Sequence, residues 1–280
     1  MRLTLLGSGS SGNVAYIEAG PAGAVARVLI DAGLPKAEIE RRLKRTTDEA
    51  GTPLGLHHID AVLVTHDHSD HAGCAAQLGR PLFATAGTRR ACSLEAGLVR
   101  SGVLFNVGPI EVQPVLLPHD ADETVGYTLS YGGCKVGVLT DCGWDAPEVA
   151  EAYAGCDVIA LETNHDVTML RFGPYPPSLK RRVGGRYGHL SNEQAASLLS
   201  RMCALGPAPR LVIASHISLA NNRPQLAKRV LERVLGRRGR VIVANQGYGT
   251  PMITVEPGRL VVSPMRHEQL CFDFAYEERP

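Results

Sequence analysis

Short apolar runs recur along the whole chain, several of them rich in Val and Ile. Residues of this kind fit the pleated, covered surface of a sheet, and runs this short match buried strands. We therefore predict strands over residues 2–6, 25–30, 61–65, 111–117, 125–131, 135–140, 157–162, 210–215 and 240–244.

Between some of these runs the apolar positions recur with the period of a helix. This pattern predicts helices over residues 36–45, 85–100, 191–205 and 224–235. The third begins with Ser191 and carries a Gln three residues later, the spacing of a capping box. Strands interspersed with helices predict a layered α/β protein.

The chain shows no internal repeat, no low-complexity tract and no Gly/Ser linker. We therefore predict one domain over residues 1–262, followed by a C-terminal tail over residues 263–280. Hydrophobic residues make up 44% of the 280 positions, which is ample for a buried core.

Net charge does not identify a partner, because 29 Lys and Arg residues nearly balance 28 Asp and Glu residues. Attraction to a polyanion must come from local clustering. Seven cysteines without a CxxC pair favour reduced thiols in a cytosolic protein. The N-terminal apolar run is too short for a signal peptide, and no stretch reaches membrane-spanning length. We expect a cytoplasmic protein without membrane contact.

The segment "VTHDHSDHAG", residues 64–73, crowds ligand-type side chains behind the strand predicted over 61–65. Ligand sites in open α/β sheets lie at the carboxyl ends of strands. A turn can aim two of these side chains at one ion and two at a second, and imidazole with carboxylate suits Zn²⁺, Mn²⁺ or Fe²⁺. The candidates are His66, Asp67, His68, Asp70 and His71.

Three later strand ends each supply one more candidate: His119, Asp141 and His216. A single strand-end histidine is more often a surface or hydrogen-bonded residue than a ligand. The clustered motif together with three compatible strand ends makes that explanation a poor one for the whole set. The sequence therefore predicts a metal centre assembled from distant segments.

The motif "THDHSDH" with these three later residues resembles the five-motif pattern of the metallo-β-lactamase fold superfamily. Within it, "GSGSSGN", "LIDAGL", "LETNHDVTMLRFGPYPPSLKRRV", "GHLSNEQAA" and "ASHIS" resemble the bacterial YycJ (WalJ) subgroup, whose members are described as DNA exonucleases. The resemblance implies a four-layer αββα sandwich with a dinuclear metal site at one edge. It implies one ion on His66, His68 and His119, a second on Asp70, His71 and His216, and Asp141 as the bridge.

One position departs from the family, which usually has Asp-Thr-Gly where this chain has Asp141, Cys142 and Gly143. Some antibiotic-hydrolysing relatives use a Cys ligand in this neighbourhood, so Cys142 is an alternative candidate. We prefer Asp141, because a strand alternates its faces and Asp141 keeps the register of the pattern.

Two ions about 3.5–4 Å apart can lower the pKa of a bridging water and hold a phosphoryl oxygen while charge builds on it. The bridging hydroxide is then the nucleophile, and the resemblance implies that Asp70 both binds metal and orients it. No Ser-His or Cys-His dyad is needed.

Residues 171–186, "RFGPYPPSLKRRVGGR", carry a local charge of +5 without an acidic residue, and aromatic side chains lie between the cations. Such a mixture suits a phosphate backbone with stackable bases, whereas the alternative is a solvated helix face. The position between His165 and His189, both in subgroup motifs, favours contact with DNA. The candidate contacts are Arg171, Tyr175, Lys180, Arg181 and Arg186.

His189 precedes the helix start predicted at Ser191, a location suited to an anion. It resembles the Gly-His-Ser element of tRNA 3′-processing relatives. Our hypothesis is that His189 binds or protonates the phosphate at the leaving side, supported by His165 and Glu162. The alternative is a helix-capping or core histidine.

The glycine-rich loop over residues 7–13 can cradle a phosphate or merely form a tight turn. Ser10, Ser11 and Asn13 are therefore secondary candidates for substrate contact.

These features predict a dinuclear-metal phosphodiesterase, and the subgroup resemblance implies a 5′-directed DNA exonuclease in DNA repair. Residues 142–215 are too few to carry the domain that RNA-processing β-CASP relatives insert there. One alternative is a small-molecule metallohydrolase acting on a cyclic nucleotide, phosphodiester or thioester, which gains if residues 171–186 lie far from the metals. Another is a non-catalytic metal-binding regulatory protein, against which the complete ligand set argues.

In the tail, "EQLCFDF" loosely resembles the Gln-Leu-x-Leu-Phe peptides that dock on the replication sliding clamp. Gln269, Leu270 and Phe272 would be the groove contacts. Asp273 interrupts the match, so we prefer a tail that packs on its own domain.

Overall fold

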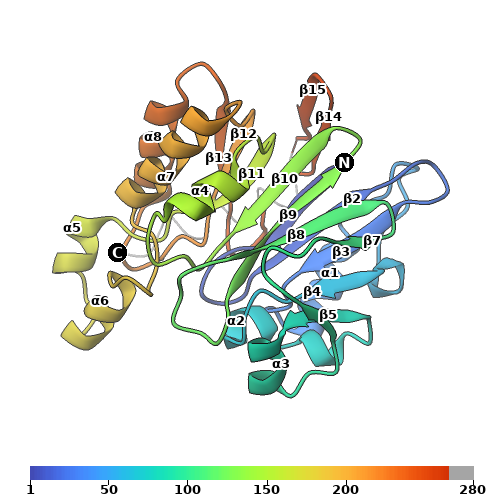
Figure 1. Cartoon of the computed structure of the whole chain (residues 1–280), viewed down its shortest axis with the longest axis horizontal. Coiled ribbons are helices and arrows are strands. Elements are labelled where there is room, and N and C mark those ends of the chain that lie inside the picture. Colours follow the sequence, from blue (N-terminus) through green and yellow to red (C-terminus); the bar gives the residue numbers. More distant parts are fainter. Residues whose placement is uncertain (265–280) are drawn as a thin grey trace.

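The computed structural model of the chain describes residues 1–264, in which two β-sheets pack face to face with helices on both outer sides (Figure 1). One sheet has the order β15-β14-β1-β2-β3-β4-β5-β6 and the other β13-β12-β11-β10-β9-β8-β7. The predicted four-layer αββα sandwich is confirmed.

The first sheet is built largely from the N-terminal half of the chain, and its outer face packs against α1 and the segments around α2 and α3. Its strands are β1 (Arg2–Gly7), β2 (Val14–Ala19), β3 (Ala26–Ile30), β4 (Ala61–Leu63), β5 (Leu82–Thr85), β6 (Gly97–Val99), β14 (Ile253–Glu256) and β15 (Arg259–Val262). Its helices are α1 (Lys36–Leu43), α2 (Ser69–Ala72) and α3 (Ala86–Cys92), with 3₁₀ turns at Leu56–His58 and Ala75–Gln77.

The second sheet packs its outer face against α4, α7 and α8. Its strands are β7 (Phe105–Val107), β8 (Ile110–Leu116), β9 (Val125–Tyr131), β10 (Cys134–Leu139), β11 (Val158–Glu162), β12 (Leu211–Ser215) and β13 (Arg240–Val243). The covering helices are α4 (Pro147–Tyr153), α7 (Asn192–Leu205) and α8 (Pro224–Leu235). Two further helices, α5 (Val167–Phe172) and α6 (Pro177–Val183), project at the left of Figure 1.

Strand β11 illustrates why the sheet needs cover on both sides. Val158 and Ala160 belong to the core between the sheets, whereas Ile159 and Leu161 pack under the outer helices. Successive side chains of a strand point to opposite faces, so an uninterrupted apolar run requires a protein layer on each face.

The predicted strands all correspond to observed ones, and three of the four predicted helices are observed within two residues of their expected ends. Ser191 is the N-cap of α7, where its hydroxyl accepts a hydrogen bond from the backbone N–H of Gln194. The predicted helix over 85–100 is wrong beyond Cys92. Ser93 adopts a left-handed conformation with φ of 52°, and Gly97–Val99 then pairs with β5 as an edge strand.

The functional edge of the sandwich follows from the strand directions. β3 and β4 are parallel neighbours in one sheet, and β10, β11 and β12 are parallel neighbours in the other. The carboxyl ends of parallel strands meet at one edge, so the residues that follow them come together.

Candidate metal centre

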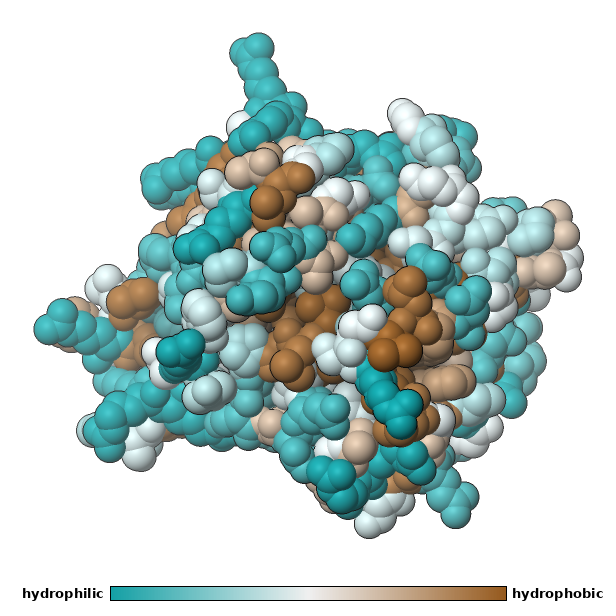
Figure 2. Space-filling model, viewed as in Figure 1, coloured by the Kyte–Doolittle hydropathy of each residue, from teal (hydrophilic) through white to brown (hydrophobic). Residues whose placement is uncertain are grey.

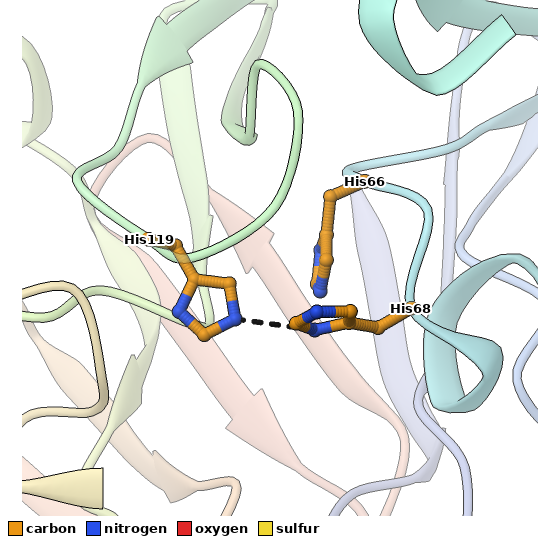
Figure 3. A group of neighbouring side chains, drawn as sticks. All are labelled: His66, His68 and His119. Carbon is orange, nitrogen blue, oxygen red and sulfur yellow. Dashed lines mark hydrogen bonds between the residues drawn. The ribbon is translucent and has the colours of Figure 1, made fainter. Parts of the chain in front are cut away.

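Three histidines form the first cluster of the site. Figure 3 shows the rings of His66 and His68, from the loop after β4, pointing toward that of His119, from the loop after β8. The Nε2 atom of His119 lies 3.3 Å from Nδ1 of His68, and each ring offers a nitrogen within 4.8 Å of the other two.

A second cluster lies beside the first and consists of Asp70, His71 and His216. Asp70 Oδ2 is 3.6 Å from Nε2 of His71 and 3.6 Å from Nε2 of His216. Asp141 stands between the clusters, because one of its oxygens lies 2.7 Å from His71 Nε2 and the other 3.7 Å from His119 Nε2.

These side chains fit divalent cations. The buried Nε2 atoms of His66 and His216 have no hydrogen-bond partner among residues 1–264, and a buried polar atom without a partner is costly. The donor atoms of His68 and His119 are 3.3 Å apart, Asp70 lies 3.6 Å from both His71 and His216, and Asp141 lies 3.7 Å from His119. Such separations suit ligands about 2.0–2.2 Å from a shared ion. The buried His and Asp clusters are therefore consistent with a dinuclear site, whose nitrogen and oxygen donors accommodate Zn²⁺, Mn²⁺ or Fe²⁺.

One buried carboxylate orients a ligand candidate of each cluster. His71 Nδ1 donates to Asp31 at 2.7 Å, and the Thr65 hydroxyl donates to the same carboxylate at 2.9 Å. His66 Nδ1 in turn donates to the Thr65 oxygen at 3.0 Å. Partners of this kind fix the ring orientation of metal-binding histidines. Sequence reasoning assigned no role to Asp31, although it follows the end of a buried apolar strand within a subgroup motif.

Glu162 connects the segments of the second sheet that reach the site. It is fully buried and accepts hydrogen bonds from His189 Nδ1 at 2.8 Å and His216 Nδ1 at 3.0 Å. It also accepts from the backbone N–H groups of Cys142 and Leu190, at 2.9 and 3.1 Å. Burial opposes its negative charge, but the adjacent histidines hold the pKa of Glu162 at about 2.

His189 lies at the open side of this network, with 20% of its side chain exposed. Burial would lower its pKa, but Glu162 and Asp141 raise the pKa of His189 well above its ordinary value before any cation adds its charge. The Nδ1 atom lies 3.2 Å from Asp141 Oδ1, so the ring stands beside the Asp141 oxygen that faces His119.

Two predicted residues lie behind the centre. His165 is 3% exposed, and burial lowers the pKa of its ring to about 4, so it is neutral. It belongs to none of the potential metal-binding groups found among residues 1–264. The same holds for Cys142, whose thiol donates to the carbonyl oxygen of Trp144 at 3.1 Å and whose pKa burial raises. Asp141 is thus the residue of this loop that joins the clusters.

The glycine-rich loop supports the ligands from the other sheet. Asn13 is buried, and its Nδ2 atom lies 3.0 Å from His71 Nε2 and 3.3 Å from the carbonyl oxygen of Asp70. Ser10 and Ser11 are exposed on the same loop. The Ser8 hydroxyl, which sequence reasoning did not single out, accepts from the backbone N–H of His216 at 2.8 Å.

The basic segment adjoins the first cluster. We call residues 166–188, which include α5 and α6, the basic rim. Arg182 Nε donates to Asp120 at 2.5 Å, next to His119, and His119 Nδ1 donates to the carbonyl oxygen of Gly188 at 2.8 Å. In Figure 2 the projection formed by α5 and α6 is largely hydrophilic, with an apolar area on it.

The five predicted DNA contacts all lie on the basic rim. Arg171 and Arg186 are exposed and lie over the rings of Phe172 and Trp144, at 5.3 and 4.6 Å from the ring centroids. Lys180 Nζ donates to the carbonyl oxygen of Arg171 at 2.9 Å. Tyr175 is half-buried, and Arg181 is exposed.

Two predictions concern other parts of the chain. The candidate clamp contacts Gln269, Leu270 and Phe272 lie outside the described residues. Of the helices in residues 1–264, none combines the length and apolar character that crossing a bilayer requires.

Comparison with known proteins identifies a family and two named relatives. Residues 26–217 match the model of the β-lactamase superfamily domain. The chain is 31% identical over 251 residues to exodeoxyribonuclease YycJ of Bacillus anthracis, covering 85% of this chain and 90% of that protein. It is 30% identical over 240 residues to exodeoxyribonuclease WalJ of Streptococcus pneumoniae serotype 2, covering 81% of this chain and 85% of that protein.

Solved structures support the fold. The metallo-β-lactamase fold protein YhfI from Bacillus subtilis superimposes with a TM-score of 0.66 at 15% identity, over 89% of this chain and 98% of that one. Zn²⁺-bound PqqB from Methylobacterium extorquens gives 0.65 at 20% identity, over 91% and 100% of the two chains. At these identities the likeness concerns the fold alone.

Proposed function

This chain belongs to the metallo-β-lactamase superfamily and is a metal-dependent hydrolase, and from that premise we propose that it is a 5′-directed DNA exonuclease with a role in DNA repair. Two curated relatives with the exodeoxyribonuclease name, which align over most of both chains, support the proposal. The observation that carries it is the position of the basic rim, which Arg182 and Gly188 join to the neighbourhood of His119. A rim far from the metals would instead have favoured a small-molecule substrate.

The proposed ligands divide as the two clusters do. His66, His68 and His119 would hold one ion, Asp70, His71 and His216 the other, and Asp141 would serve both. Bound divalent ions would supply a water of lowered pKa and stabilise negative charge on the phosphoryl oxygen. The Asp70 side chain is 24% exposed, so its carboxylate faces the open side, where it would orient the attacking water.

His189 is the proposed donor to the leaving oxygen. Its Nδ1 atom is bonded to Glu162, so the opposite ring nitrogen remains for the substrate. Glu162 orients the ring and favours its charged form, and the neutral His165 would support this pair from behind. A positioned proton donor contributes roughly 10²–10⁴-fold to a rate.

The basic rim would bind the strand. We propose that the cations contact phosphates and that the aromatic side chain stacks against bases, with the exposed serines of the glycine-rich loop on the other side of the centre. The residues are Arg171, Tyr175, Lys180, Arg181, Arg186, Ser10 and Ser11. Asn13 would act by holding the metal ligands.

The tail and the cell compartment complete the proposal. For the tail, docking of a peptide containing Gln269, Leu270 and Phe272 on the replication sliding clamp is the alternative to packing on its own domain. Measuring clamp binding before and after deletion of residues 265–280 tests this alternative. Unchanged binding after deletion would remove this partner. A DNA substrate and the six free cysteines found in residues 1–264 fit the cytoplasm.

The test is hydrolysis of 5′-labelled single- and double-stranded DNA by purified protein reconstituted with Mn²⁺ or Zn²⁺. We expect short labelled products from the first time points, as removal from the 5′ end requires. His189→Ala should lower kcat by about 10²–10⁴-fold while the metal content stays the same. His57→Ala, an exposed histidine on a 3₁₀ turn, is the matched control and should keep full activity.

Two results would contradict this function. One is faster turnover of cyclic nucleotides or thioesters than of DNA, which would make the protein a small-molecule hydrolase. The other is loaded protein that hydrolyses none of these compounds, which would favour the non-catalytic alternative. Unchanged turnover in the His189 variant would remove only its role as proton donor.

A further inference from the structure

An ion pair stands at the mouth of the metal centre, and it bears on how an exonuclease selects a strand end. We propose that Arg182, held on Asp120 in the absence of substrate, recognises a 5′-terminal phosphomonoester and so favours strand ends over internal phosphodiesters. The proposal rests on the exonuclease function proposed above and names a specificity residue of that site.

The pair is bidentate and lies next to the first cluster. Arg182, in the last turn of α6, donates from Nε to Asp120 Oδ2 at 2.5 Å and from Nη2 to Asp120 Oδ1 at 3.3 Å. Asp120 Oδ1 is in turn 3.4 Å from Nε2 of His119 and 3.8 Å from Nε2 of His68. Only the carboxylate of Asp120 therefore separates the guanidinium from two candidate metal ligands.

Both partners remain accessible to a ligand. The side chain of Arg182 is 58% exposed and that of Asp120 is 28% exposed. The hydrogen bonds to Asp120, together with the charges of Asp120 and Asp70, raise the pKa of Arg182, so the guanidinium stays charged. A phosphate bound by Arg182 would lie beside the atoms that act on the scissile bond.

Arg182 differs from the other cations of the basic rim. Within the described part of the chain it is the cation of residues 171–186 that has a carboxylate partner, whereas Arg171 and Arg186 lie over aromatic rings. A phosphate can approach those two without displacing an anion. To bind Arg182 it must compete with Asp120.

Charge decides that competition. An internal phosphodiester carries a single negative charge, the same as the carboxylate that already holds the guanidinium. A terminal phosphomonoester carries about −1.5 to −2 at pH 7 and presents three acceptor oxygens. Arginine binds phosphate through the same two-pronged geometry that it uses for a carboxylate. The terminal group therefore displaces Asp120 more effectively than an internal one.

The exchange does not leave Asp120 without a partner. His68 Nδ1 faces the cluster, 3.3 Å from His119 Nε2, so Nε2 of His68 is the ring nitrogen left to donate outward. Asp120 is already 3.8 Å from it and needs only a small shift to accept that hydrogen bond. Such an outer partner would orient His68, so arrival of a terminal phosphate would also order a candidate metal ligand.

The test compares oligonucleotides of one sequence that carry a 5′-phosphate, a 5′-hydroxyl, or a 5′-hydroxyl with a 3′-phosphate. Two quantities are measured for each: kcat/KM with metal, and binding by fluorescence anisotropy in EDTA. We expect wild-type protein to prefer the 5′-phosphate by about 10- to 100-fold, the range of hydrogen bonds to charged groups. Arg182→Ala should reduce that preference to near unity.

Two further variants separate this role from a structural one. Asp120→Asn removes the negative charge that holds Arg182. Binding of the 5′-hydroxyl strand should therefore improve, and the preference for the 5′-phosphate should decrease because the weaker ligand gains affinity. Arg90→Ala breaks another exposed Arg–Asp pair, between Arg90 of α3 and Asp122 on the same loop as Asp120, 3.1 Å apart, and should behave as wild type.

Equal wild-type turnover of all three oligonucleotides would overturn the proposal, as would a preference that survives in Arg182→Ala. A preference for the 3′-phosphate would show that the site reads the opposite end. If no DNA is hydrolysed with any metal, the proposed function fails, but the EDTA binding series still decides whether Arg182 recognises the terminal phosphate.

Discussion

The metal centre and the basic rim lie side by side but are built in opposite ways. In the centre, His66, His71 and His216 are at most 2% exposed, and the second ring nitrogen of each is held by a hydroxyl or carboxylate. The rim consists of helices of six and seven residues whose cations mostly face solvent. The candidate metal ligands are thus held in a fixed geometry, whereas the proposed substrate contacts lie on an exposed surface that is joined to the centre at Arg182 and Gly188.

The contrast predicts a steep gradient of mutational effects, and the largest lies at the residue that the two clusters share. Asp141→Asn removes the charge that pairs with His71 and faces His119. We expect loss of bound metal, measured by elemental mass spectrometry, and a fall in turnover of about 10²–10³-fold or more. Asp145→Asn, in the same loop, is the control. Full metal content and activity in the Asp141 variant would contradict the view that the buried centre is more sensitive to substitution than the basic rim.

A substitution at Asp31, which contacts a candidate ligand, tests whether the orientation of the ligand rings matters as much as the ligands themselves. Asp31→Asn keeps the shape of the carboxylate that accepts from His71 but replaces one acceptor oxygen with an amide. Metal affinity should fall by about 10–100-fold, as measured by competition with a chelator. Asp60→Asn, an exposed aspartate one strand away, serves as the control. Equal affinities would mean that the buried partner does not preorganise the centre.

Substitutions in the basic rim should change the salt dependence of DNA binding and should hardly change the metal content of the protein. The double variant Lys180→Ala with Arg181→Ala should weaken DNA binding several-fold and reduce the salt dependence of log K by about two, one for each lost phosphate contact. Lys228→Ala with Arg229→Ala removes the same charge from α8 and is the matched control. An equal change of slope in both doubles would mean that net charge, not the rim, attracts the DNA.

The smallest expected effect is a change in stability at Glu38 of α1, the helix that packs next to the glycine-rich loop. Arg41 and Arg42 lower the pKa of Glu38 to about 2, and Arg42 also donates to the carbonyl oxygen of Leu6. Because the pKa of Glu38 is lower in the folded protein, its carboxylate stabilises the fold at pH values above its ordinary pKa of 4.5. This contribution disappears as the pH falls from 4.5 toward 2.

Glu38→Gln should therefore lower the free energy of unfolding at pH 7 by less than about 1 kcal/mol, because the pairs are near the surface. The difference from wild type should vanish toward pH 2 in urea titrations performed in EDTA. Glu40→Gln on the same helix is the control. A difference that persists at low pH would assign the effect to packing and not to charge.

How much the sequence could predict differs between the same two regions. The spacing of His66, His68, Asp70 and His71 is local, so the motif is visible without a structure. His119, Asp141 and His216 could be predicted because each follows an apolar run. β10 and β12 are parallel neighbours of β11, and β8 runs in the same direction because β8 and β10 are both antiparallel to β9, so the ends of these strands meet at one edge. Asp31 was missed because a lone buried acid has no spacing that distinguishes it from any other aspartate after a strand.

Outside the metal-ligand pattern, contacts between side chains from distant segments could not be predicted. Arg182 meets Asp120 only because α6 folds back over the loop after β8, and no local pattern encodes that contact. The end of α3 is a similar case, because the edge strand β6 depends on hydrogen bonds to β5 that helical periodicity does not report. Residues that follow buried strands were therefore predictable, whereas contacts such as that between Arg182 and Asp120 were not.

Glu162 sets a boundary for anyone who wishes to redesign this protein. Because it binds two histidines and the backbone on both sides of the rim, at Cys142 and Leu190, it fixes where a replacement segment must begin and end. A graft that stops short of Gly188 would replace the proposed recognition surface and leave the contacts of Glu162 intact. A graft that runs past Gly188 would also have to restore the hydrogen bonds that Glu162 makes with His189, the proposed proton donor, and with His216, a candidate metal ligand.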